Sequence, residues 1–168
     1  LKPKVFDGRV TADSVPVTVA DDLTVNDVAR IEGPVVVVGA GLMGVRLGML
    51  LKSRGVDVIV LERRGRILGD DDVIYDQIFF PEIVAENGVE IRTDTEATAI
   101  TARGVETTLG GTTTVVQAAQ VILAVGHEPD VPEWCGSEIT PAYVIGSARR
   151  RGRVFDAIHD AFYSTLHY

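Results

Sequence analysis

The chain has 168 residues, of which 46% are hydrophobic and 24% are charged, and its formal net charge at pH 7 is −8. This length suits one medium-sized domain, and the acidic balance argues against nucleic acid or an anionic membrane as the main partner. The single cysteine, Cys135, excludes an internal disulfide, a CxxC redox pair, a cysteine-ligated zinc site and an iron–sulfur cluster held by this chain alone.

The sequence predicts neither a membrane span nor a targeting segment. Its apolar runs fall short of the roughly 20 residues that a membrane helix needs, and no basic region followed by an apolar one stands at the N-terminus. We therefore expect a soluble, cytoplasmic protein without a membrane partner. The first residue is Leu1 rather than methionine, so the chain being a piece of something larger stays open.

The N-terminal region mixes weak strand and helix patterns, and a clear pattern of secondary structure begins only near residue 35. Alternating valines between residues 15 and 19 predict a short strand, and residues 27–31 predict one helical turn. Val35–Val38 is a continuous β-branched run, which is typical of a strand covered on both faces. Gly39–Gly41 then turns the chain.

The residues that follow complete a βαβ unit. Helical periodicity covers 42–54, Gly55 ends that helix, and a second apolar run covers 56–61. The apolar face predicted for the helix consists of Met43, Leu47, Leu50 and Leu51.

A second helix and a run of short strands are predicted next. The helix covers roughly 71–87, is interrupted near Pro81 and stops at Asn87–Gly88, and a third strand follows at 89–92. Thr- and Val-rich segments separated by glycines then predict an antiparallel meander and a further buried strand, at 97–102, 104–109, 112–117 and 119–125.

The C-terminal part predicts a loop, a short strand and a final helix. The loop covers 127–141, with Trp134 packed beneath it; Tyr143–Ile145 is the last strand candidate, and a helix follows Gly152. The order of elements predicts an α/β fold: a Rossmann-like three-layer domain with a parallel sheet and an inserted antiparallel β-meander.

Gly39, Gly41 and Gly44 form a G-x-G-x-x-G motif between a predicted strand and a predicted helix. In this context Gly39 permits the tight turn, Gly41 lets the backbone approach a pyrophosphate, and Gly44 lets the helix pack on the strand. The pyrophosphate would lie at the N–H groups of the helix N-terminus, where the helix dipole also favours anions. The motif therefore predicts dinucleotide binding.

Glu62 ends the second predicted strand, about 20 residues after the glycines, where a Rossmann domain places the acid that binds the adenosine ribose. Its charge would repel a 2′-phosphate, which favours NAD(H) over NADP(H). Arg63, Arg64 and Arg66 follow directly and could bind such a phosphate, although solvated loop charges are an equally good interpretation.

Two further segments carry a resemblance to a known family. With Leu123–Gly126 and Tyr143–Gly146, and more weakly with Thr24–Val28, the chain resembles the pyridine-nucleotide domain of flavoproteins with two dinucleotide-binding domains. Within that group it is most similar to the C-terminal part of NADH:flavin oxidoreductases of the 2,4-dienoyl-CoA reductase and trimethylamine dehydrogenase type, which are old yellow enzyme-like. The resemblance covers about residues 22–167.

The resemblance implies a module of a larger flavoprotein. Residues 1–21 would be a lead-in segment and 22–168 a single dinucleotide-binding domain, with FAD or FMN on a partner domain or subunit, including an FMN- and iron–sulfur-binding TIM barrel. The expected cofactor-binding residues are Gly39, Gly41, Leu42, Met43, Gly44, Glu62, Arg63, Arg64, Ala124, Val125, Gly126 and Gly146. No catalytic residue and no metal ligand is expected within the chain.

The sequence departs from the family pattern at three points. Ser147 stands where the family has an aspartate that holds the flavin ribityl chain, Arg46 replaces a common glutamate, and a second glycine fingerprint is absent from the chain. Three hypotheses follow: an NAD(H) module that presents nicotinamide to a flavin held elsewhere, a non-catalytic ADP- or NAD-binding structural or docking module, and a vestigial scaffold. The intact glycines and Glu62 speak against the third.

Two other features allow weaker hypotheses. His127 follows the loop after the last strand of the sheet and could line the nicotinamide end of a cleft. An arginine cluster near the start of the final helix could meet a phosphate or an acidic partner, or it could be solvated: Arg149, Arg150, Arg151 and Arg153.

Overall fold

Two compact units make up the described part of the chain. They are Val5–Val125, here the large unit, and Leu1–Lys4 with Gly126–Tyr168, here the small unit. The computed structural model describes residues 1–69, 74–132, 134–135, 143–150, 152 and 154–166, with the backbone alone over 74–77.

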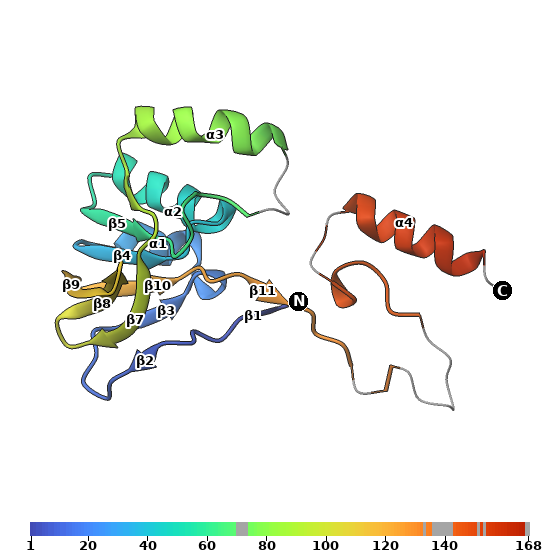
Figure 1. Cartoon of the computed structure of the whole chain (residues 1–168), viewed down its shortest axis with the longest axis horizontal. Coiled ribbons are helices and arrows are strands. Elements are labelled where there is room, and N and C mark those ends of the chain that lie inside the picture. Colours follow the sequence, from blue (N-terminus) through green and yellow to red (C-terminus); the bar gives the residue numbers. More distant parts are fainter. Residues whose placement is uncertain (70–73, 133, 136–142, 151, 153, 167–168) are drawn as a thin grey trace. The chain divides into compact units, whose positions relative to one another are not determined.

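A five-stranded parallel sheet forms the middle layer of the large unit (Figure 1). Its order is β3-β10-β4-β5-β6, and every pairing is parallel. The strands are β3 (Val17–Val19), β10 (Gln120–Leu123), β4 (Val35–Val38), β5 (Val58–Leu61) and β6 (Glu90–Arg92). The fold class predicted from the sequence is confirmed.

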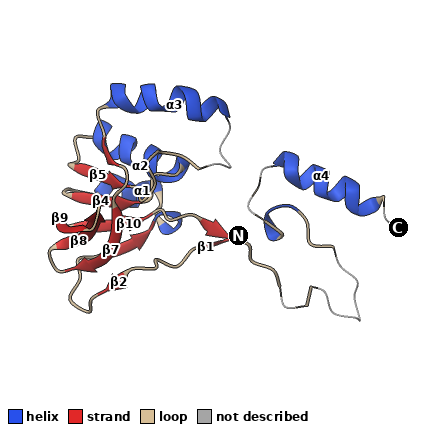
Figure 2. Cartoon of the chain, viewed as in Figure 1, coloured by secondary structure: helices blue, strands red, loops and turns tan. Residues whose placement is uncertain are grey.

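The four valines of β4 account for the layers. Val35 and Val37 belong to one core cluster, Val36 and Val38 to another, and none of the four is more than 7% exposed. The valines alternate between the two clusters because successive side chains of a strand point to opposite faces of the sheet. Helices cover the first face, and a second sheet covers the other. Figure 2 shows helices α2 and α3 on one side of the sheet. The helices are α1 (Val25–Arg30), α2 (Leu42–Ser53) and α3 (Ile74–Asn87).

The second sheet is the predicted antiparallel meander, extended by one short parallel strand. Its order is β2-β7-β8-β9. Glycines with positive φ make both turns of the meander: Gly104 at φ 122 starts β8, and Gly110–Gly111 close the hairpin. The strands are β2 (Arg9–Val10), β7 (Glu96–Thr101), β8 (Gly104–Leu109) and β9 (Thr112–Gln117).

The face that helix α2 buries overlaps only in part with the one that periodicity predicts: Leu51 is buried and Leu47 packs against the core. Met43 and Leu50 are exposed at 43% and 49%, so their predicted burial is wrong. The face that meets the sheet carries small side chains, and a Cβ added at Gly48 would lie 2.6 Å from Cγ2 of Val60. Because glycine lets the helix approach this closely, apolar periodicity alone misplaces part of the face. The buried residues are Gly44, Val45, Gly48 and Leu51.

Three further expectations are wrong. Helix α3 continues through Pro81, an exposed residue whose ring costs the helix one backbone hydrogen bond without ending it. Tyr143–Ile145 forms no strand, because no described strand pairs with it. Trp134 is 61% exposed rather than packed beneath its loop.

The described residues of the small unit include a short antiparallel strand pair and a longer helix. Strand β1 (Lys2–Pro3) pairs antiparallel with β11 (His127–Glu128), and neither strand is predicted by the sequence. The predicted final helix is present as α4 (Val154–Thr165), after the short 3₁₀ helix η2 (Gly146–Ala148). No helix in the described ranges is long and apolar enough to cross a membrane.

A capping box starts helix α1, directly after the short 3₁₀ helix η1 (Ala20–Asp22). The Thr24 hydroxyl oxygen accepts from the Asp27 N–H at 3.2 Å, and Oδ2 of Asp27 accepts from the Thr24 N–H at 3.0 Å. The hydrogen bonds from the Thr24 hydroxyl and N–H hold the pKa of Asp27 below its ordinary value.

This cap predicts a pH-dependent stability for Asp27→Asn. A carboxyl with a lowered folded pKa stabilises the fold above its unfolded pKa, and that contribution disappears as the pH falls through the folded value. We therefore expect Asp27→Asn to lower the thermal midpoint near about pH 7, and the difference to shrink as the pH falls from about 5 towards 3. Circular dichroism melts of both proteins across this range test the prediction, and a difference independent of pH contradicts it.

Candidate nucleotide-binding site

The glycine loop lies between the carboxyl end of β4 and the start of α2, and two of its glycines are required by close packing. Gly39 has φ 106, and a Cβ added there would lie 2.4 Å from the carbonyl oxygen of Ala124. A Cβ added at Gly44 would lie 1.9 Å from the carbonyl oxygen of Gly39. These glycines therefore hold the loop against β10 and α2 against the loop.

Gly41 is different, because the space beside it is open. It caps α2 with φ −69 and ψ 176, values that any residue adopts, and an added Cβ would meet no atom within 4 Å. The N–H groups of the first turn, including those of Leu42 and Met43, have no acceptor within the helix. Open space next to free N–H groups at a helix N-terminus is suited to a phosphate.

Glu62 follows β5 and reaches back to the glycine loop. Its Oε2 accepts a hydrogen bond from the Ala40 N–H at 2.8 Å, and its Oε1 accepts from the Arg64 N–H at 3.0 Å. A carboxylate has about four acceptor positions, so two bonds leave capacity for the hydroxyl groups of a ribose. The half-buried carboxylate thus lies beside the loop, as the sequence predicts for an adenosine site.

The segment after Glu62 is fixed by contacts that sequence reasoning missed. Leu68 is 3% exposed at φ 64, and its N–H donates to the Ala40 carbonyl at 2.8 Å. Asp94, at φ 52, donates its N–H to the Arg64 carbonyl at 2.9 Å. Aspartate is among the residues that adopt the left-handed conformation more often, whereas leucine rarely does, so the sequence holds no signal for it at Leu68.

Arg63 and Arg64 follow Glu62 with exposed side chains. Nη1 of Arg63 lies 3.5 Å from Oδ2 of Asp7, but both side chains are mostly exposed, so this ion pair contributes little. Arg46, the departure from the family pattern, places its guanidinium 5.7 Å from the ring centroid of Phe80 and so joins α2 to α3.

The remaining expected site residues divide between the two units. Ala124 and Val125 end the large unit, where Ala124 contacts the glycine loop. Gly126 and Gly146 belong to the small unit. There the Gly126 carbonyl accepts from the Lys4 N–H at 2.9 Å, and the Gly146 N–H donates to Oδ2 of Asp160 at 3.0 Å.

Two of the arginines before α4 are already paired within the small unit. Nη1 of Arg149 lies 3.5 Å from Oδ1 of Asp160, whose side chain is 9% exposed. Nη2 of Arg150 lies 3.6 Å from Oδ1 of Asp156 and 3.9 Å from Oδ1 of Asp160. These contacts favour a structural role for both. Arg151 and Arg153 lie outside the described residues.

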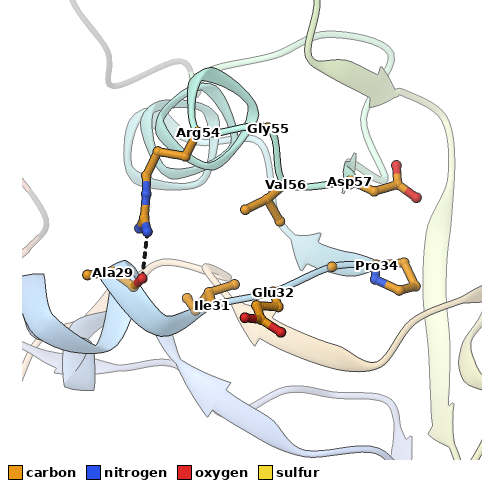
Figure 3. A pocket seen from close by; sticks show the side chains of 9 residues that line it. Ala29, Ile31, Glu32, Pro34, Arg54, Gly55, Val56 and Asp57 are labelled. Atoms are coloured by element: carbon orange, nitrogen blue, oxygen red, sulfur yellow. Dashed lines mark hydrogen bonds between the residues drawn. The ribbon is translucent and has the colours of Figure 1, made fainter.

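An open hollow of about 570 Å³ lies at the other end of the sheet, before β4 and β5 (Figure 3). Its charged lining residues are Glu32, Asp57 and Arg54. The Arg54 guanidinium donates to the carbonyls of Val28 and, at 2.5 Å, Ala29. Those carbonyls belong to the last turn of α1, so Arg54 caps this helix. We assign the hollow a structural role. Among the described side chains, no group of three or more histidines, cysteines or carboxylates gathers as a metal site.

The pyridine nucleotide-disulphide oxidoreductase family matches the chain over residues 9–141. The chain belongs to this family. The match spans the glycine loop, Glu62 and the meander, so the prediction of a pyridine-nucleotide-binding redox module is confirmed at this level. The narrower resemblance to the 2,4-dienoyl-CoA reductase type is not decided by it.

Individual proteins agree with this assignment to the pyridine nucleotide-disulphide oxidoreductases. The chain is 33% identical over 99 residues to bilirubin reductase of Mediterraneibacter gnavus (strain CC55_001C), covering 59% of this chain and 15% of that protein. It is 30% identical over 101 residues to dihydrolipoyl dehydrogenase of Mycobacterium leprae (strain TN), covering 58% of this chain and 21% of that protein. The chain therefore spans only about a fifth of the length of these relatives.

Solved structures of longer proteins contain the same fold. A complex of 2-naphthoyl-CoA reductase with 2-naphthoyl-CoA matches 96% of this chain and 24% of its own, with a TM-score of 0.69 and 22% identity. Histamine dehydrogenase from Rhizobium sp. 4-9 matches 76% of this chain and 20% of its own, with a TM-score of 0.62 and 20% identity. Water-forming NADH oxidase from Lactobacillus brevis, bound to NADH, matches 77% of this chain and 29% of its own, with a TM-score of 0.58 and 20% identity.

Proposed function

We propose that the chain binds NAD(H) and acts as the nucleotide module of a flavin-dependent oxidoreductase. It would position the nicotinamide for hydride transfer to FAD or FMN held by another domain or subunit. The observation that carries the proposal is the open space at Gly41, next to the first turn of α2, with the Glu62 carboxylate beside the same loop. The family supports a pyridine nucleotide as the ligand.

The chain's own residues would supply binding and orientation. The N–H groups of Gly41, Leu42 and Met43 would donate to the pyrophosphate, and Glu62 would accept hydrogen bonds from the ribose hydroxyls. When bound, the nicotinamide supplies the hydride chemistry. Ala124 closes one side of the glycine loop, because its carbonyl and methyl group contact the positions of Gly39 and Gly44.

NAD(H) is favoured over NADP(H) by the charge beside the ribose position. Both oxygens of Glu62 are fixed by backbone N–H groups, so the carboxylate cannot swing away to admit a 2′-phosphate without breaking these bonds. These contacts support the choice of NAD(H).

The partner is proposed from the resemblance in sequence. Leu123–Gly126 and Tyr143–Gly146 resemble the dienoyl-CoA reductase and trimethylamine dehydrogenase type, in which a TIM barrel with FMN and an iron–sulfur cluster precedes the dinucleotide-binding part. A second candidate function is a non-catalytic ADP- or NAD-binding module that stabilises a larger flavoprotein or docks an electron carrier. It is favoured by Ser147, which replaces the flavin-binding aspartate of that family.

Calorimetric titration of the whole chain with NADH, NADPH and ADP tests both candidates. We expect NADH to bind more tightly than NADPH, because of repulsion at Glu62, and more tightly than ADP, because the nicotinamide half adds contacts. Equal affinities for ADP and NADH would favour the non-catalytic module. Binding of none of the three ligands would contradict both.

A further inference from the structure

The segment that follows β5 holds both polar groups of Ala40. The Ala40 N–H donates to Oε2 of Glu62 at 2.8 Å, and the Ala40 carbonyl accepts from the Leu68 N–H at 2.8 Å. Ala40 itself is fully buried, so water does not compete for these groups. The peptide planes on either side of Ala40 are therefore fixed by residues far along the chain from the glycine loop.

The contact from Leu68 is made under unfavourable backbone conditions. Leu68 has φ 64, a region that residues with a Cβ rarely adopt. Its side chain is only 3% exposed, and burial of that side chain together with the bond to Ala40 offsets the unfavourable conformation. A conformation of this kind persists only where the surrounding structure determines it, and such residues gather at ligand sites.

The bond from Leu68 also sets the direction of the Gly41 N–H. A trans peptide is planar, so the Ala40 carbonyl and the Gly41 N–H point in opposite directions. Because the carbonyl is turned to Leu68, the Gly41 N–H is turned away from Leu68. The same bond polarises the peptide and strengthens its N–H as a donor. Beside Gly41 the structure has open space.

We propose that Leu68 is a positioning residue for the nucleotide: its backbone N–H orients and polarises the Gly41 N–H that meets the pyrophosphate. This inference rests on the proposed function, since it assumes that the pyrophosphate lies at the start of α2. Leu68 does not contact the ligand. It acts through the peptide between Ala40 and Gly41 and readies the donor before the nucleotide arrives.

Exchanging the Leu68 amide for an ester tests the proposal, because it removes the N–H and keeps the side chain. Incorporation of the α-hydroxy analogue of leucine makes this change. We expect the Kd values for ADP and inorganic pyrophosphate to rise about threefold to tenfold, the factor for one lost hydrogen bond. The amide proton of Gly41 should also move upfield in the NMR spectrum of the free chain.

The matched control is the same exchange at Val56. Its N–H donates to the Leu51 carbonyl at 3.0 Å, at the amino end of β5 and away from the glycine loop. This ester should leave both the Kd values and the Gly41 shift unchanged. An equal loss of binding in the Val56 ester, or unchanged binding in the Leu68 ester, overturns the proposal. An unmodified chain that binds neither ADP nor pyrophosphate overturns the proposed function itself.

If the chain with the Leu68 ester does not fold, the Leu68→Gly variant serves as the second test. Glycine adopts φ 64 without strain and keeps the N–H, but it lacks the buried side chain that holds this N–H in place. We expect changes in the same direction, smaller in size, in both the Kd values and the Gly41 shift. A Leu68→Gly chain with unchanged values for both overturns the proposal.

Discussion

Replacing Gly44 with alanine is expected to destabilise the large unit by about 3 kcal/mol and to abolish nucleotide binding. The added Cβ would lie 1.9 Å from the carbonyl oxygen of Gly39 and 3.2 Å from Cβ of Ala124. The first of these atoms belongs to the backbone, so no side-chain rotation relieves the overlap. Helix α2 must move away from the loop, and this movement separates the N–H groups of its first turn from the Glu62 carboxylate. Urea denaturation followed by circular dichroism measures the loss.

Gly41→Ala is the matched control for this prediction. Its φ of −69 suits alanine, and the added methyl group meets no atom within 4 Å. We expect the free energy of unfolding to change by less than about 1 kcal/mol, the scale of an N-cap substitution. The methyl group would nevertheless fill the space where the pyrophosphate approaches, so NADH binding should be lost from a folded chain. If Gly41→Ala binds NADH as the unchanged chain does, the pyrophosphate does not lie at Gly41.

Glu62→Ala and Glu62→Gln are expected to separate the two roles of this side chain, which are to accept the Ala40 N–H and to place a negative charge beside the ribose position. Alanine removes the acceptor of the buried Ala40 N–H, and an unpaired buried N–H costs about 1 to 3 kcal/mol. The alanine variant should therefore lose stability and NADH affinity together. Glutamine keeps an oxygen for Ala40 but carries no charge and offers no second acceptor to the Arg64 N–H, which is exposed to water, so its stability should fall by less than that of the alanine variant.

The preference between NADH and NADPH provides the decisive comparison. Without the negative charge, Glu62→Gln should bind the two nucleotides with more similar affinities, because repulsion of the 2′-phosphate is removed. Calorimetry on both variants, with thermal melts of the same samples, gives affinity and stability side by side. If Glu62→Gln keeps the full preference for NADH, another group discriminates, and Glu62 acts only on the loop.

The elements that the sequence predicts correctly are those that local chemistry determines. Four consecutive valines can form a strand covered on both faces, and they lie in β4 with both faces buried. Gly110–Gly111 between Thr-rich runs predicts a hairpin, and both glycines have positive φ. The glycine fingerprint and Glu62 likewise lie next to one another, because adjacent parallel strands end at the same edge of a sheet.

The features that the sequence does not predict depend on tertiary contacts. Leu68 and Asp94 adopt positive φ without being glycine, because backbone bonds to Ala40 and Arg64 hold them there. In helix α2 the position of Leu50 follows from contact at Gly48 rather than from its own hydrophobicity. Such positions are determined by neighbours distant in the chain, and those neighbours are known only once the fold is known.

The position of β10 between β3 and β4 has a consequence for how the chain folds. Val121 pairs with Val17 on one side and with Val36 on the other, so the β3 pairing joins residues about 100 positions apart. Contacts this distant in sequence carry a high loop-closure cost and slow folding. A ribosome-bound chain that ends before Gln120 would already hold the glycine fingerprint and Glu62, yet β3 and β4 would each keep an unpaired edge until β10 emerged. Until then these strand edges are open to pairing with other chains.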